Sequence, residues 1–457
     1  MAAFHLTIQK KGQVFTPSEI VDLMVEKLFQ KRRPAPNDRV LDPGCGTGAF
    51  IKGILNWCER ENVAIPCIVG VESDAQFIKE AQKLIVDRET ITVMKGNFLL
   101  ENFGAFDFII GNPPYVRIDK LSEPEREMYR KNFETAVNRF DLYMLFFEKA
   151  LKSLKTQGRL VFITPEKYEY TLTARPLRKL MSKFHVEEIH HVREDVFRGL
   201  VTYPTITTIN RNGEEVTKVI HRDGASITIR LPTDGSRWIS VIRGESKLPN
   251  SKAILEDICM RISSGVATGE DKAFIIPKNE VPEALRNLAH PTVSGKDLTF
   301  DGTKVTHCML IPYDHSGKLL PEEKLGEFRK RLSKHRKALN SRYCVRKKKH
   351  PWYAFHENPP MGDILRAKIL FKDIAKEPKF WLDEKGKIVP QHSVYYLVPK
   401  DPRLLPFLVD YLNSEQVRKW VIANCQRAAN DFIRLQSSVL RRLPIPENLA
   451  GRENVGA

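Results

Sequence analysis

Asn112, Pro113, Pro114 and Tyr115 are the residues of this sequence with the clearest chemical meaning, because they directly follow FDFIIG, an apolar run that predicts a β-strand. Two consecutive prolines stiffen the turn and remove two backbone donors, which leaves carbonyl groups free to accept hydrogen bonds. An asparagine carbonyl beside a proline carbonyl makes a rigid pair of acceptors suited to a planar amino group. Tyr115 adds a flat face on which a base can stack. The alternative is a Pro-Pro loop that merely ends the strand.

A glycine-rich turn lies earlier, in RVLDPGCGTGAF, where a predicted strand runs into Gly44, Gly46 and Gly48 and then into a predicted helix. Glycine removes Cβ, so the backbone can approach a ligand and the first helix amides can point toward it. The next predicted strand ends in Glu72, at the distance where a carboxylate binds ribose hydroxyls. Together they predict a nucleoside-bearing cofactor. The glycines alone also fit a dinucleotide fingerprint or a plain tight turn, but the Asn-Pro-Pro-Tyr segment argues against a nicotinamide cofactor.

These residues must be positioned by regular secondary structure. From residue 39 onward, short β-branched runs alternate with longer amphipathic stretches, and this alternation is typical of a βαβ series. The predicted strands are Arg39–Asp42, Cys67–Glu72, Ile91–Lys95, Phe106–Gly111, Arg159–Thr164, Val186–Val192 and Thr205–Asn210. The predicted helices are Phe50–Arg60, Ala75–Val86, Tyr143–Leu154 and Arg175–Ser182. We expect a Rossmann-like, doubly wound α/β domain with a mostly parallel seven-stranded sheet.

The alternation stops in a polar, turn-rich passage around Asp234–Arg243. We therefore expect one domain over residues 1–245 and a second, smaller α+β domain over residues 246–457. The second half predicts a basic helical run at Glu322–Leu339 and helices near Leu404–Asn413 and Ser414–Gln426. Residues 251 to 457 carry 36 basic and 24 acidic side chains, against 37 and 32 in residues 1 to 250. The second half is the candidate polyanion-binding domain, although a charge run can also be a solvated face.

Composition limits the class of protein. The 457 residues include 73 Lys and Arg against 56 Asp and Glu, a net charge of +17, and 42% are apolar, which is normal for a folded chain of at least two domains. The seven cysteines are scattered, without Cys-x-x-Cys or His-Glu-x-x-His, so we expect reduced thiols and no metal site. No apolar run approaches the roughly 20 residues that span a bilayer, and MAAFHLTIQKKGQ lacks the features of a signal peptide. We expect a soluble, cytoplasmic protein without a membrane partner.

With both motifs in hand, the chain resembles the S-adenosylmethionine-dependent DNA methyltransferases that act on exocyclic amino groups, above all the Taq-type adenine-N6 enzymes of restriction-modification systems. Eight collinear segments carry the resemblance over most of residues 12 to 210: QVFTPSEIV, DPGCGTG, GVESD, GNFLL, GNPPY, FDLYMLFFEKAL, GRLVFITPEKY and VREDVFRGLVTYP. Weaker segments of the second half, SSGVATGEDKAF, KILFKDIAKEPKFW and QSSVLRRLPIP, resemble the target-recognition domain of such enzymes. The resemblance implies a prokaryotic enzyme, associated with the nucleoid through double-stranded DNA. It also implies a monomer with a separate cognate restriction endonuclease.

The resemblance implies roles for individual residues. Those expected to bind S-adenosylmethionine are Thr16, Asp42, Gly44, Gly46, Glu72, Asn97, Phe98 and Asn112. Thr16, Asp42 and Gly44 would hold the methionine end, Glu72 the ribose and Phe98 the adenine. Asn97 departs from the aspartate that the family usually has. Its oxygen can still accept from the cofactor's adenine amino group, so we expect weaker rather than lost binding.

Asn112, Pro113 and Pro114 would bind the target amino group, while Tyr115 and Phe197 would stack on the target base. Phe197 is followed by Arg198, where the family often has proline. An adenine amino nitrogen donates its lone pair into the ring and lies inside the duplex, so the base must be flipped out. Two acceptors on its N–H bonds then favour a tetrahedral nitrogen for direct transfer. His190 and His191, adjacent on a predicted strand, are interpreted as structural.

The expected DNA-binding surface lies in the basic half. Its candidate residues are Arg342, Arg346, Lys347, Lys348, Lys349, Trp352 and Tyr353. The Asn-Pro-Pro-Tyr segment alone also fits enzymes that methylate ribosomal RNA guanine or a protein glutamine. The upstream FTP, the FDLY segment and the basic half favour DNA. Cytosine-N4 methylation is a closer alternative, although those enzymes more often have serine where Asn112 stands. A binding protein that kept the fold without the chemistry is disfavoured because the four motif residues are intact.

Overall fold

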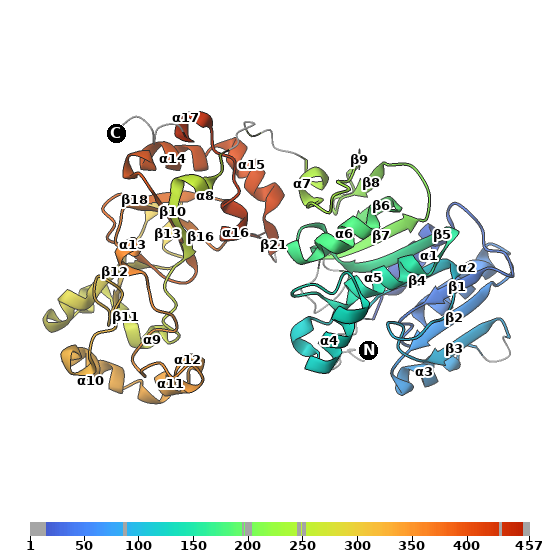
Figure 1. The fold of residues 1–457 in the computed structure, drawn as a ribbon, viewed down its shortest axis with the longest axis horizontal. Coiled ribbons are helices and arrows are strands. Elements are labelled where there is room, and N and C mark those ends of the chain that lie inside the picture. The colour runs from blue at the N-terminus through green and yellow to red at the C-terminus, as the bar shows by residue number, and fades with distance from the viewer. Residues whose placement is uncertain are drawn as a thin grey trace, which may run out of the picture. The chain divides into compact units, whose positions relative to one another are not determined.

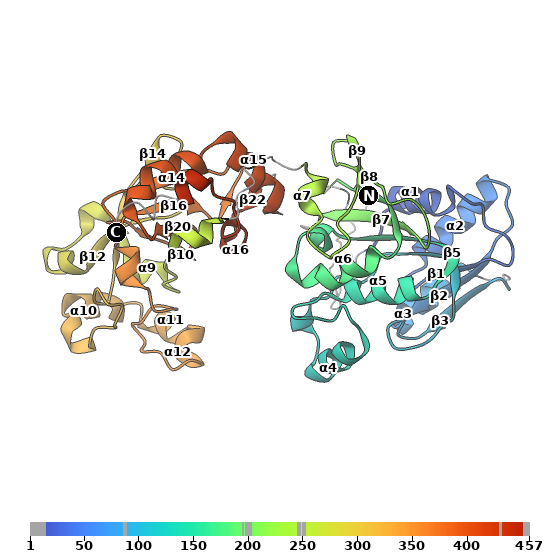
Figure 2. The same ribbon diagram turned by 45° about the horizontal axis from the view of Figure 1, so that its top comes forward.

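The computed structural model describes residues 15–85, 89–193, 196, 203–244, 248, 253–428 and 432–450. The chain forms two compact units, Met1–Gly244 and Glu245–Ala457. Figures 1 and 2 show both units from two directions. No helix of the described residues is long and apolar enough to cross a membrane.

Unit 1 is built on one twisted sheet with the strand order β3-β2-β1-β4-β5-β7-β6-β8-β9. The first five strands of this order are parallel, and β7 runs antiparallel to both of its neighbours. The strands are β1 (Arg39–Asp42), β2 (Cys67–Glu72), β3 (Ile91–Lys95), β4 (Phe106–Gly111), β5 (Leu154–Pro165), β6 (His185–His191), β7 (Pro204–Asn210), β8 (Thr217–Ile220) and β9 (Ser226–Ile229). The predicted doubly wound α/β class is confirmed, and the C-terminal ends of β3, β2, β1 and β4 meet along one edge.

The sheet has nine strands among the described residues, so the expected seven-stranded sheet was too small. The two additional strands, β8 and β9, form an antiparallel pair at the outer edge beyond β6. Each has only four residues, and β9 has no fully buried side chain. Short, half-exposed edge strands carry little hydrophobic signal, which explains why the sequence pattern missed them.

Helices cover both faces of this sheet. On one face, α1 (Ser18–Phe29), α2 (Ala49–Arg60) and α3 (Ala75–Gln82) bury an apolar stripe against the strands. On the other face, α5 (Leu142–Lys152) and α6 (Arg175–Met181) share a second core that includes Trp238. Two further helices are α4 (Glu123–Asn132), which starts at a Ser122–Glu125 capping box, and α7 (Ile239–Ile242). Helices on both faces explain why the parallel strands read as continuous apolar runs.

Unit 2 contains two four-stranded sheets, ordered β10-β20-β16-β18 and β11-β15-β12-β19, a three-stranded sheet, β17-β22-β21, and the β13-β14 pair. Its strands are β10 (Cys259–Ser264), β11 (Ile275–Pro277), β12 (Ala289–Val293), β13 (Leu298–Thr299), β14 (Gly302–Thr303), β15 (His307–Leu310), β16 (Lys368–Lys372), β17 (Ile374–Ala375), β18 (Phe380–Asp383), β19 (Val389–Pro390), β20 (Val394–Pro399), β21 (Gln426–Ala428) and β22 (Phe432–Arg434). Its α-helices are α8 (Leu255–Ile258), α9 (Asp271–Phe274), α10 (Glu327–Ser333), α11 (Arg336–Ser341), α12 (Tyr343–Arg346), α13 (Met361–Ile364), α14 (Leu405–Leu412), α15 (Glu415–Asn424), α16 (Ser437–Leu440) and α17 (Glu447–Ala450). The unit is mixed α and β, as expected.

Candidate functional site

A cavity of about 800 Å³ opens at the edge of the sheet where β1, β2, β3 and β4 end. Its lining comes from the loops after these four strands, together with Phe15 ahead of α1 and residues of α4 and α5. The predicted site residues that line it are Gly44, Gly46, Glu72, Asn97, Phe98, Asn112, Pro114 and Tyr115. Segments that lie far apart in the sequence therefore meet at one cavity, because adjacent parallel strands end at the same edge.

The glycine turn after β1 requires glycine for different reasons at different positions. Gly46 (φ 53°) and Gly48 (φ 86°) both adopt the left-handed conformation that glycine reaches without a steric cost. A Cβ on Gly48 would lie 2.8 Å from Leu84 Cδ1, whereas a Cβ on Gly46 would meet nothing within 4 Å. The N–H of Gly48 donates to the Cys45 carbonyl at 2.8 Å and closes the turn just before α2.

Glu72, at the end of β2, holds this turn from the neighbouring strand. Its Oε2 accepts from the Gly46 N–H at 3.0 Å, and its Oε1 accepts from the Ser73 and Asp74 N–H groups, both at 2.8 Å. The carboxylate is thus fixed by three backbone amides at the cavity wall. Carboxylate oxygens have more lone pairs than these three donors use, so the group can still accept from ribose hydroxyls.

Asp42, the last residue of β1, is fully buried, and no hydrogen bond of good geometry reaches either of its carboxylate oxygens from the described residues. Burial is the main cause that raises the pKa of Asp42 to about 8; the nearby Gly44 N–H lowers this pKa in part, and the charge of Glu72 adds to the rise. A buried carboxylate without a donor is costly unless a cation or donor reaches it. An ammonium group, such as that of the methionine end of S-adenosylmethionine, fits this need.

Asn97 and Phe98 follow β3 on the far side of the cavity. The Asn97 side-chain oxygen accepts from the Leu99 N–H at 3.0 Å, which fixes the orientation of its amide. The Phe98 ring is only 2% exposed and packs against Phe146 with ring centroids 5.4 Å apart. Phe98 therefore lines the cavity and also belongs to the core. Core packing holds its ring rigidly, and the edge of such a ring suits a flat heterocycle.

Asn112 and Thr16, ninety-six residues apart, meet beside the glycine turn: the Asn112 Nδ2 donates to the Thr16 hydroxyl oxygen at 3.1 Å. This contact fixes the orientation of the Asn112 side-chain amide, with its nitrogen toward Thr16. Pro113 and Pro114 supply no N–H that could compete. The Tyr115 hydroxyl donates to the Ile163 carbonyl at 3.2 Å, and burial raises the pKa of this phenol above its ordinary value. The ring is thereby held by its hydroxyl end.

Sequence reasoning missed four aromatic residues of the cavity wall, namely Phe15, Phe77, Tyr129 and Phe146. Phe15 is 44% exposed and meets Phe77 edge to face with centroids 5.9 Å apart. The Phe15-Thr16-Pro17 sequence could have indicated Phe15, because Thr16 of the same triplet was already expected at the site. Phe197 lies outside the described residues, so its expected role stays a prediction.

Glu166, Glu169 and His191 form the one group of the described residues whose ligand atoms lie close enough together to hold a metal ion. The His191 Nε2 lies 3.0 Å from Glu169 Oε1, and Arg222 pairs with Glu166 at 2.6 Å. Burial alone would raise the pKa of Glu166, but Arg222 and Arg243 lower it below its ordinary value. Two guanidinium groups thus already balance the charge that would attract a cation.

His190 lies next to His191 on β6, and burial lowers the pKa of His190 to about 4.

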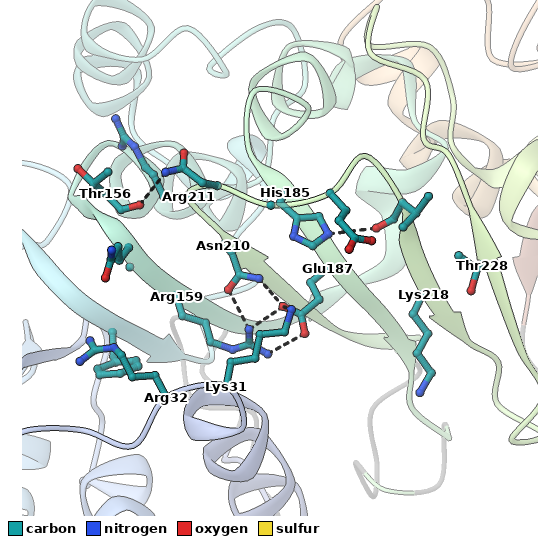
Figure 3. Close-up of a pocket in the computed structure, with 17 residues that line it drawn as sticks. Lys31, Arg32, Thr156, Arg159, His185, Glu187, Asn210, Arg211, Lys218 and Thr228 are labelled. Atoms are coloured by element: carbon teal, nitrogen blue, oxygen red, sulfur yellow. Dashed lines mark hydrogen bonds and ion pairs between the residues drawn. The ribbon is translucent and has the colours of Figure 1, made fainter.

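A second cavity, of about 730 Å³, lies where β5 and β6 begin and β7 ends (Figure 3). Its centre is a paired network: Arg159 contacts Glu187 at 2.6 Å and Asn210 at 2.8 Å, and Lys31 lies 3.1 Å from the same carboxylate. Burial alone would raise the pKa of Glu187, but Arg159 and the other partners lower it to about 2. These strand ends are opposite to those of the glycine turn, so this cavity is distinct from the candidate active site.

The expected DNA surface of unit 2 needs correction at three positions. Arg342, Trp352 and Tyr353 are 7%, 8% and 7% exposed, so they belong to the interior. The Trp352 indole donates to Glu322 at 3.1 Å, and the Tyr353 hydroxyl donates to the Leu320 carbonyl at 2.9 Å. An aromatic-rich segment beside a basic run was read as surface, but its rings fill the core of this unit. Arg346, Lys347, Lys348 and Lys349 are exposed, as expected.

The chain is similar to known restriction-modification proteins. Residues 56–197 match the Eco57I restriction-modification methylase family, and residues 319–445 match the TaqI-like C-terminal specificity domain. It is 28% identical to the Type II methyltransferase M.PaeR7I of Pseudomonas aeruginosa over 96% of this chain and 86% of that protein. It is 24% identical to M.XhoI of Xanthomonas vasicola over 96% and 91% of the two chains.

Among solved structures, the fold is similar to that of the Type IIL restriction-modification enzyme MmeI in complex with DNA, with a TM-score of 0.64 and 13% identity. The match covers 93% of this chain but 64% of that one, so this chain spans less than two thirds of that enzyme. At this level of identity the match concerns the fold alone.

Proposed function

We propose that this chain is a methyltransferase of a restriction-modification system, like the proteins to which it is similar, and that it transfers a methyl group from S-adenosylmethionine to the N6 amino group of a flipped adenine in a short duplex sequence. We further propose that unit 1 is the catalytic domain and unit 2 the target-recognition domain, acting as one monomer, with a separate endonuclease recognising the same site.

The observation that carries the proposal is the contact between Asn112 and Thr16 in the cavity that also holds the glycine turn and Glu72. It brings an oriented amide oxygen, two prolines without N–H groups and a tyrosine ring next to the groups suited to a nucleoside cofactor. This combination matches the needs of a planar amino group, which must be held by acceptors and stacked on its flat face.

The residues present suit S-adenosylmethionine, which supplies an electrophilic sulfonium methyl group when bound. Asp42 meets the need for an anion opposite the ammonium, Glu72 offers acceptors for ribose hydroxyls, and Phe98 offers a buried ring edge for the adenine. Tyr115 lines the same cavity of about 800 Å³.

Asn112 acts on the target by orientation and charge. Its oxygen, with the adjacent proline carbonyl, accepts the two N–H bonds of the adenine amino group and favours a tetrahedral nitrogen with a free lone pair. The C–N bond would form as the bond between methyl carbon and sulfur breaks, with a neutral thioether as the leaving group. The nitrogen thereby becomes cationic, and the acceptors stabilise that charge before a proton leaves to water. No strongly basic side chain is required for this step.

Methyl transfer from radiolabelled S-adenosylmethionine tests the proposal, with plasmid DNA, total RNA and release factor protein as separate acceptors and Asn112→Ala as the matched negative control. We expect label in DNA alone, recovered as N6-methyladenine. Label recovered as N4-methylcytosine would show that the target base is cytosine and not adenine. Label in RNA or protein would overturn the proposed substrate class.

A further inference from the structure

Tyr343 and the residues after it form an exposed basic turn, defined here as residues 343–349 of unit 2. The Tyr343 side chain is 61% exposed, and Arg346, Lys347, Lys348 and Lys349 are exposed as well. None of these four cations forms an ion pair with any residue that the structure describes. Four unpaired cations beside one exposed aromatic ring are an unusual use of surface.

Nearby basic residues show the contrast. On the preceding segment Arg329 pairs with Glu322 at 2.8 Å and Lys330 pairs with Glu327 at 2.6 Å. These charges are balanced within the unit, whereas those of the basic turn are not. Lys334 and Lys337, ahead of the turn, are likewise exposed and form no ion pair with the residues that the structure describes. The uncompensated charge therefore extends from these lysines into the turn and is open to a polyanion.

Arg342 explains why the turn has a defined shape. Its guanidinium donates to the carbonyls of Leu339 at 3.0 Å, Thr268 at 2.6 Å and Trp352 at 2.6 Å. It thereby ties three separate segments together directly beneath Tyr343. Gly269 (φ 76°) makes room, because a Cβ there would lie 3.0 Å from Arg342 Cδ. Arg342 was expected to bind phosphate. It instead fixes the segment that carries the exposed cations.

The turn is also fixed at its other end. Cys344 is fully buried, and its carbonyl accepts from the His350 N–H at 3.0 Å. Lys349 has φ 56°, a left-handed conformation that is uncommon for a residue with a Cβ and reverses the chain here. Tyr343 thus lies on a short helix whose backbone is held by buried neighbours on both sides, so the segment that carries its ring need not be ordered on binding.

We propose that Tyr343 is a direct DNA contact, its ring packing on a deoxyribose of the duplex while Arg346 and the three lysines neutralise neighbouring phosphates. The inference rests on the proposed function and adds to it a residue and a mode of contact. A tyrosine ring offers a large apolar face with few rotatable bonds, and a contact with the sugar carries no sequence information. The family match over residues 319–445 includes this turn.

Binding of the full-length protein to a fluorescent 30-base-pair duplex of mixed sequence tests the inference across a salt series. We compare wild type with Tyr343→Ala and with its matched control Tyr343→Phe. Truncation of a well-packed aromatic contact costs about 1 to 3 kcal/mol, so Tyr343→Ala should weaken binding by about 5- to 150-fold. Tyr343→Phe should stay within about twofold of wild type because the ring remains. The salt dependence should not change in either variant, because no charge is removed.

Several outcomes separate this inference from the proposed function. Unchanged affinity of Tyr343→Ala, with wild type binding the duplex well, would overturn the inference alone. An equal loss in Tyr343→Phe would also overturn it, because the hydroxyl rather than the ring would then be the contact. Wild type that binds a matched RNA duplex but not DNA would overturn the proposed function. Melting temperature and cofactor affinity should be unchanged in Tyr343→Ala, since the side chain is exposed and lies in unit 2.

Discussion

At the scale of single residues, the site depends on side chains whose partners are already fixed before any ligand binds. Asn112 is oriented by Thr16, Glu72 by three backbone amides, and Tyr115 by the Ile163 carbonyl. Preorganised groups of this kind stabilise a transition state without having to move. Each of them can be removed separately with a distinct expected effect.

Replacing Asn112 with Ala should lower turnover by at least about 100-fold, on the scale of losing one positioned transition-state partner. Cofactor affinity should stay nearly unchanged, because the amide oxygen acts on the target. Steady-state kinetics with labelled cofactor and equilibrium cofactor titration separate the two effects. A variant that keeps more than about a third of wild-type turnover would remove Asn112 from its role.

Glu72→Ala should have the opposite signature and weaken cofactor binding by about 1.5 to 3 kcal/mol, with little change in turnover at saturating cofactor. The loss would include the Gly46 contact as well as the proposed ribose contact, because the same carboxylate accepts from the Gly46 N–H. Glu80→Ala is the matched control, since Glu80 is an exposed acid on α3 that pairs with Lys83 at 2.8 Å. Equal cofactor affinity for wild type and Glu72→Ala in calorimetry would exclude Glu72 from the site.

Asp42 gives a prediction that depends on pH. Its folded pKa of about 8 lies above its ordinary value of 3.8, so folding retains a proton that the unfolded chain releases. Between these values the free energy of unfolding therefore falls as pH rises. Asp42→Asn removes this pH-dependent loss of stability. The variant should be more stable than wild type near pH 8 and should bind S-adenosylmethionine more weakly.

Urea denaturation at pH 5 and pH 8 without cofactor measures the Asp42 effect as a difference between variant and wild type. We expect the stability advantage of Asp42→Asn to be larger at pH 8 than at pH 5. An advantage that stays the same at both values, or reverses, would show that Asp42 is ionised in the free protein.

At the scale of elements, the strands that carry the site were the most predictable part of the chain. The bounds of β1 to β4 were predicted as observed, because each is a short run rich in apolar and β-branched residues that ends at glycine, proline or a polar turn. The contact between Thr16 and Asn112 was not predictable, since it depends on where α1 packs against the sheet. The expected basic helical run over Glu322–Leu339 is broken in the structure, where Gly326 adopts φ 48° between two helical segments.

The basic turn of unit 2 makes a prediction at the same scale. Lys347, Lys348 and Lys349 are exposed and unpaired within the described part of the chain, so replacing all three with Gln should weaken DNA binding without unfolding the unit. The slope of log binding constant against log salt should become flatter by about 2 to 3, if each lysine contacts one phosphate. Cognate and random duplexes should be affected alike. An unchanged slope would mean that these lysines are only a solvated face.

At the scale of the whole molecule, the chain forms two compact units, and their separate roles in catalysis and target recognition stay a prediction. The doubly wound sheet could be predicted because its strands alternate regularly with helices. The detailed fold of unit 2 could not, since its strands are short and its β-sheet partners are distant in sequence, as with β10 and β20. The interior position of Arg342 had no signal either, because a buried arginine is indistinguishable from a surface one in a basic run.

Sequencing of genomic DNA for modified bases tests the central claim most directly, after expression of the chain in a host that lacks DNA methylation. The account predicts N6-methyladenine at one position of one short sequence, absent when the host carries Asn112→Ala. Modified bases that are absent with wild type despite soluble, cofactor-binding protein, or that are found only as N4-methylcytosine, would contradict the account.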